Sequence, residues 1–181
     1  SSAASDVYKR QAFKVSREVV KIIRYLAIIG IIVMFLGILG VVLDGWNQNG
    51  MLTLDYNSQI AQVPIWFPML ILLLAAAIFY MVVMIMRALD KLLMNFQKDS
   101  YFNSENITYL SKTLRCLLIA TGIQLAVNLI FNFLNLEHVS DLFELSLKDY
   151  WLNIVLLVVN YIGILVIKHG VQLQKDYDEI I

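Results

Sequence analysis

IWFPMLILLLAAAIFYMVVMIM, residues 65–86, contains 22 residues and no charged side chain. A hydrocarbon core about 30 Å thick requires roughly 20 apolar residues in a helix, so this stretch predicts a helix that crosses a membrane. Similar segments, free of charged side chains, occupy residues 25–43, 116–136 and 150–167. Soluble domains do not contain four apolar segments of this length in succession. The sequence therefore predicts an all-α integral membrane bundle of four transmembrane helices, formed by one domain over residues 12–181.

The first eleven residues, SSAASDVYKRQ, are set apart from this domain. They resemble an adapter-derived leader, and we interpret residues 1–11 as a non-native leader. The single cysteine, Cys116, excludes an internal disulfide and the four-helix membrane thiol oxidoreductases, which need paired cysteines. The net charge is zero, which gives no reason to expect direct nucleic-acid binding.

Lysine and arginine are distributed unevenly about the predicted spans. Thirteen of the fourteen lie before the first span, between the second and third, or after the fourth, and only Lys148 lies between the third and fourth. Cytoplasmic loops of membrane proteins are enriched in these residues. The distribution predicts that both termini are cytoplasmic (N-in, C-in). We therefore expect a multi-pass membrane protein with both ends on the cytoplasmic side.

The segments outside the spans are short. The second helix is expected to continue through residues 87–96, followed by a turn at residues 100–103, where Asn103 or Ser104 can cap the next helix. On the outer side, the alternation in residues 52–56 predicts a short strand. Residues 137–149 fit either an interfacial helix or a solvated loop.

Polar side chains on the third predicted span recur at intervals of three and four residues, which places them on one helix face. They are Thr121, Gln124, Asn128, Asn132 and Asn135. Asn153 and Asn160 share a face of the fourth span. Matching the midpoints of the two antiparallel spans places Asn160 level with Gln124, and Asn153 level with Asn132.

These seven residues form the candidate intramembrane polar network. An unpartnered amide in hydrocarbon costs several kcal/mol, so they must face another helix, water or a ligand. One interpretation is a hydrogen-bonded ladder that fixes the register of the two helices. The other is a hydrated pocket for a small polar ligand.

Basic residues of the predicted inner loop form a second candidate site, for a partner or for anionic lipid. They are Arg87, Lys91, Lys98, Lys112 and Arg115. The alternative is that these charges only set the topology. The acidic tail, residues 176–179, fits a solvated tail, a contact for a cation or basic partner, or docking against the basic loop.

The sequence contains no recognisable motif for catalysis, metal binding or nucleotide binding. The four apolar spans contain no charged residue of the kind that proton coupling requires. His138 and His169 are predicted on opposite sides of the membrane and cannot share a metal. Phosphate-binding loops and nucleophile elbows are absent as well. We expect no enzyme, no catalytic residue, no metal site and no cofactor.

Two stretches carry a family resemblance. Residues 92–115 contain hydrophobic residues, Phe96, a short turn, Phe102, and then S-x-N-I and L-R. Residues 170–174, GVQLQ, lead into an acidic stretch that closes on isoleucine. In these features and in its four spans the chain resembles the small bacterial membrane proteins grouped as DUF2975, a domain family of unknown function. The family's usual glycine in the inner turn is replaced here by Asp99 or Ser100.

The resemblance implies a bacterial inner-membrane protein, often encoded beside a Cro-type helix-turn-helix regulator, and it transfers no catalytic residue. Our first hypothesis is a non-enzymatic sensor, regulator or accessory subunit that lies in the lipid bilayer and contacts a cytoplasmic partner. The second is a transporter, or a subunit of one, that uses the polar network. The sequence gives no indication of the oligomeric state.

Overall fold

The computed structural model describes residues 2–47, 49–56, 59–133 and 147–180. Its elements, in chain order, are α1 (Ser2–Asn47), β1 (Met51–Tyr56), β2 (Gln59–Pro64), α2 (Trp66–Gln97), α3 (Ser104–Phe133) and α4 (Leu147–Ile180). All four helices are long and apolar enough to cross a membrane, which confirms the predicted all-α membrane fold. Each predicted span lies in one helix, except that residue 65 precedes α2 and residues 134–136 are outside the described part.

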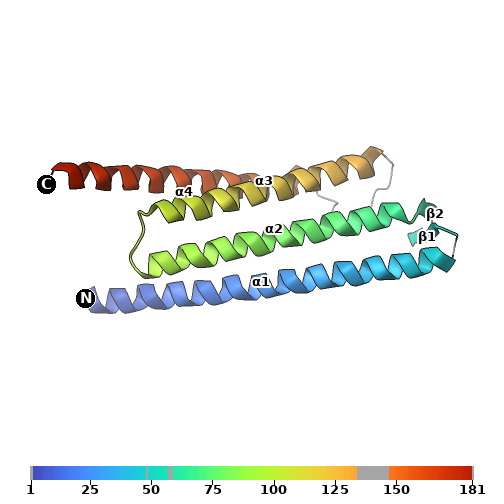
Figure 1. Cartoon of the computed structure of the whole chain (residues 1–181), viewed down its shortest axis with the longest axis horizontal. Helices are drawn as coiled ribbons and strands as arrows, with labels where there is room; N and C mark the ends of the chain where they lie inside the picture. The colour runs from blue at the N-terminus through green and yellow to red at the C-terminus, as the bar shows by residue number, and fades with distance from the viewer. Residues whose placement is uncertain (1, 48, 57–58, 134–146, 181) are drawn as a thin grey trace.

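The helices lie side by side in chain order, as Figure 1 shows. Among the described residues, only consecutive helices have Cα atoms within 8 Å of one another. The bundle is therefore open, with α1 and α4 as its outer members. Both termini and the α2–α3 turn lie at one end, and the two strands lie at the other (Figure 1). We call these the basic end (residues 2–24, 87–115 and 168–180) and the hairpin end.

Glycines allow α1 to approach α2 closely. A Cβ atom at Gly30 would lie 2.9 Å from the Phe79 ring, and one at Gly37 would lie 3.4 Å from Leu72. Small residues at such positions let membrane helices pack without large side chains between their backbones. Gly40 differs from these two glycines, since no described atom lies within 4 Å of a Cβ placed there.

Two clusters of buried side chains connect the helices. Phe67 and Ala75 of α2 pack with Val127 and Phe131 of α3 toward the hairpin end. The second cluster joins three helices at the basic end through Leu92, Leu110 and Ile167. Most other large apolar side chains of α1 and α4 are exposed, as expected for helices that meet lipid.

A β-hairpin follows α1. The strand predicted at residues 52–56 is confirmed as β1, and it pairs antiparallel with β2, which was not predicted. Pro64 is the last residue of β2 and lies opposite Met51. Proline has no N–H to donate, so the end of a strand is a position where it costs few hydrogen bonds between the strands. The alternatives for residues 137–149 fall almost entirely outside the described residues.

The turn between α2 and α3 begins earlier than the predicted turn at residues 100–103. The N–H of Asp99 donates to Phe96 O (3.0 Å) and that of Ser100 donates to Asn95 O (3.0 Å), the pair of bonds that defines a Schellman motif. Asp99 accordingly has a φ of 58°. The Glu105 N–H then donates to Asn103 Oδ1 (3.0 Å), so Asn103 caps α3 as predicted.

Candidate functional site

Three residues of the predicted polar network meet in one hydrogen-bonded group between α3 and α4. The Asn153 carboxamide donates to Gln124 Oε1 at 2.8 Å and to Thr121 Oγ1 at 3.2 Å. All three side chains are partly buried. Polar groups in an apolar environment need hydrogen-bond partners within the protein, and this group supplies them. Thr121 and Gln124 lie on one face of α3 and are both satisfied by the same amide.

This pairing corrects the expected register of the two helices. Asn160 was expected level with Gln124, whereas Asn153 occupies that level. The expectation assumed that the two apolar segments have their midpoints at the same depth. The hydrogen bond from Asn153 instead places Gln124 near the start of α4, which begins at Leu147, so Asn153 does not lie level with Asn132 either. Asn160 consequently lies two turns farther toward the basic end.

The remaining members of the network are distributed along the same interface. The Asn128 amide donates to the Tyr150 hydroxyl at 3.4 Å, and Tyr150 is buried. Asn132 belongs to α3, but its side chain is not described, and Asn135 lies outside the described residues. Tyr150 was not among the predicted residues, although its position at the start of the fourth span marks an interfacial tyrosine.

Asn160 has an apolar environment. It lines a groove of about 740 Å³ between α2, α3 and α4, together with Leu117, Leu156 and Val159. Its Oδ1 atom is buried and has no hydrogen-bond partner in the described part of the chain. Thr113, the other polar residue of the groove, donates its hydroxyl to Tyr109 O (3.1 Å). The groove thus offers hydrocarbon surface rather than a polar, hydrated pocket.

The predicted basic residues divide into two groups. Arg87, Lys91 and Lys112 line a cavity of about 540 Å³ between α1, α2 and α3, which we call the basic cavity. Arg24 of α1 also lines it and was not among the predicted residues, although it directly precedes the first apolar span. Lys98 and Arg115 do not line it.

Aromatic rings hold two of these cations. Lys91 Nζ lies 5.7 Å from the centroid of the Tyr109 ring, and the Arg24 guanidinium carbon lies 5.4 Å from that of Tyr25. Both distances suit cation–π attraction. Among the described residues neither Arg87 nor Lys112 forms an ion pair.

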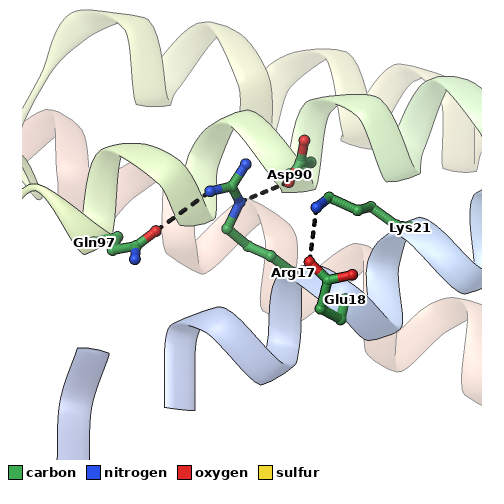
Figure 2. Close-up of polar contacts among 5 residues, drawn as sticks. All are labelled: Arg17, Glu18, Lys21, Asp90 and Gln97. Carbon is green, nitrogen blue, oxygen red and sulfur yellow. Dashed lines mark hydrogen bonds and ion pairs between the residues drawn. The ribbon is translucent and has the colours of Figure 1, made fainter. Parts of the chain in front are cut away.

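The carboxylate of Asp90, which lines the basic cavity, forms an ion pair with a residue that does not line it. Figure 2 shows Arg17 of α1 directed at α2, where its Nε donates to Asp90 Oδ1 at 2.8 Å and its Nη1 to Gln97 Oε1 at 3.3 Å. Glu18 and Lys21 pair with each other nearby at 2.7 Å (Figure 2). The Arg17 contacts join the extensions of α1 and α2 beyond their apolar segments.

A buried asparagine organises the turn at the basic end. Asn106 is 0% exposed, and its Nδ2 donates to Ser100 O (2.8 Å) and Tyr101 O (2.9 Å). Its Oδ1 accepts from Asn95 Nδ2 at 2.8 Å. Asn106 is the asparagine of the S-x-N-I pattern, so this part of the pattern has a structural explanation. The sequence signal was present, but the role of the residue was not predicted.

The two stretches that carried the family resemblance meet at the same end. A Cβ atom at Gly170 would overlap the ring of Phe102, so the glycine permits the turn to lie against α4. Phe102 and Gly170 line a groove of about 670 Å³ with Leu173, Gln174 and Tyr177, which we call the tail groove. Its apolar residues were not predicted as a site.

No group of three or more potential metal ligands occurs among the described residues. His169 is exposed on α4, and His138 lies outside the described part. Comparison with family models, with curated proteins and with solved structures found no match to this chain.

Proposed function

We propose that this chain is a non-enzymatic protein of the bacterial inner membrane that acts as a sensor, regulator or accessory subunit and binds a cytoplasmic protein at its basic end. The orientation rests on the thirteen lysine and arginine residues at that end, against one elsewhere. The resemblance to DUF2975 proteins supports the same class and suggests a helix-turn-helix regulator as the partner.

The tail groove is the observation that carries the proposal. Phe102, Leu173 and Tyr177 remain 44%, 56% and 67% exposed. All three lie beyond the apolar segments, where the surroundings are aqueous rather than lipid. Exposed apolar clusters in water mark interaction sites, and aromatic residues contribute strongly to binding at interfaces.

Charge indicates what kind of partner fits this groove. Asp176 and Glu179 are exposed on the same last turns of α4, and neither forms an ion pair with a described residue. This favours a partner contact over docking of the tail against the basic loop. The proposed partner segment is therefore apolar with basic residues at its edges.

The alternative, a transporter or transporter subunit, has less support. Thr121, Gln124 and Asn153 satisfy one another, and Asn160 lies in an apolar groove. A polar pathway between α3 and α4 would require groups that remain available to a solute. The geometry favours a structural role for these residues.

Copurification tests the proposal. The detergent-solubilised chain, expressed with the products of its neighbouring genes, should retain one cytoplasmic protein at a defined stoichiometry. Leu173→Ser with Tyr177→Ala should reduce its recovery at least about tenfold, since two interface anchors typically contribute more than 1.4 kcal/mol together. Val15→Ser with Val19→Ser, exposed apolar residues of α1 outside the groove, is the matched control.

The identity of the retained protein separates the two hypotheses. A DNA-binding regulator supports the first, and an ATPase subunit supports the transporter. Equal recovery with the groove variant and with the control variant would contradict the assignment of the tail groove.

A further inference from the structure

The basic cavity concentrates cations from three helices. Arg24 comes from α1, Arg87 and Lys91 from α2, and Lys112 from α3. Among the residues that the structure describes, Asp90 is the one acid that lines the cavity, and Arg17 already binds its carboxylate at 2.8 Å. The four cations therefore keep an uncompensated positive charge, which an anionic ligand would neutralise.

The cavity lies at the depth of lipid headgroups. Arg24 directly precedes the apolar segment 25–43, and Arg87 directly follows the segment 65–86. Lys112 lies one helical turn before the segment that begins at residue 116. Three independent helices thus place a cation at the same boundary between apolar and polar surroundings.

The lining of the cavity is amphipathic. Met84 and Ala88 line it beside the cations, and Met84 belongs to the apolar segment of α2. A soluble phosphate would use only the charged part of this surface. A phospholipid would use both parts, with its phosphate on the arginine and lysine side chains and its acyl chains along α2.

We propose that the basic cavity binds the phosphate of an anionic phospholipid from the leaflet at the basic end, with Arg24, Arg87, Lys91 and Lys112 as cationic donors. This inference goes beyond the proposed function, because it concerns a lipid site on α1–α3 rather than the tail groove. Binding in detergent requires neither the protein partner nor a given orientation. Failure of one proposal therefore leaves the other standing.

Native mass spectrometry of the delipidated full chain tests the site. Titration with phosphatidylglycerol should give one saturable bound lipid, whereas phosphatidylcholine should bind far more weakly. Arg87→Gln with Lys112→Gln removes two charges from the cavity and should weaken phosphatidylglycerol binding about thirtyfold. Lys98→Gln with Arg115→Gln removes two charges from the same stretch outside the cavity and should change binding less than about twofold.

Two further measurements test whether the variants are folded and whether the bound phosphate belongs to a lipid. Arg87→Lys with Lys112→Arg retains the charges and should bind nearly as well as the unchanged chain, which separates loss of charge from loss of fold. Inorganic phosphate should fail to displace the lipid at millimolar concentration. Equal binding of both lipids, equal weakening by the two charge-removing variants, or displacement by inorganic phosphate would each overturn the proposal.

Discussion

At the scale of single residues, the turn at the basic end shows how one amide determines a local structure. Asn106 uses both N–H groups and its oxygen on three partners, Asn95, Ser100 and Tyr101, while fully buried. Each buried hydrogen bond contributes about 1 kcal/mol, and the loss of one partner leaves the others unsatisfied.

Replacement of this amide should destabilise the fold. We expect Asn106→Ala to lower the free energy of unfolding by about 3 kcal/mol, as measured by unfolding in sodium dodecyl sulfate and followed by far-UV circular dichroism. Thr108→Ala, an exposed position on the same helix, should change it by less than about 0.5 kcal/mol. Similar losses for both variants would show that the amide network is not the cause.

Asp99 illustrates what sequence alone can and cannot explain. The type of this residue did not predict the conformation of the turn. The φ of 58° at Asp99 is left-handed, a conformation that is strained for most side chains and tolerated by aspartate. The Tyr101 hydroxyl also donates to Asp99 Oδ1 at 3.2 Å.

At the scale of helices, residue types predicted which faces of α3 and α4 are polar but not their register. Hydropathy gives the ends of an apolar segment only to within a few residues, so matching of midpoints carries an error of one or more turns. The hydrogen bonds from Asn153 to Thr121 and Gln124 fix the register directly. Sequence could not supply this, because the amides on α4 are seven residues apart and fit either alignment equally.

The corrected register predicts opposite effects for the two asparagines of α4. A double-mutant cycle of Asn153→Leu and Gln124→Leu should give a coupling free energy of about 0.6 kcal/mol, the average for such bonds within membranes. Asn160→Leu should be neutral or stabilising, because it removes a buried acceptor that has no described partner. The same unfolding assay measures both. Coupling of Gln124 to Asn160 instead of Asn153 would restore the midpoint alignment.

At the scale of the whole molecule, composition and length were sufficient to predict four helices long and apolar enough to cross a membrane. They were insufficient to predict which helices touch. Only consecutive helices approach within 8 Å in the described part, so the neighbours follow chain order. The grouping of Arg24 with Arg87, Lys91 and Lys112 depends on that order, since α1 packs on α2 and α2 on α3. A linear list of basic residues could not separate these from Lys98 and Arg115.

Orientation is the remaining property of the whole chain, and cysteine labelling tests it. Cys116 is buried and is the only cysteine, so Cys116→Ser provides a background without thiols. On this background we expect a membrane-impermeant maleimide to label Gln62→Cys at the hairpin end in intact cells, and Lys98→Cys at the basic end only after the membrane is disrupted. Both native side chains are exposed, so access depends on the side of the membrane rather than on burial. The reverse pattern would place the thirteen basic residues outside, against the charge bias, and would remove the cytoplasmic partner from the proposed function. It would not move the basic cavity away from the membrane boundary, because the sequence position of its cations beside three apolar segments is the same in either orientation.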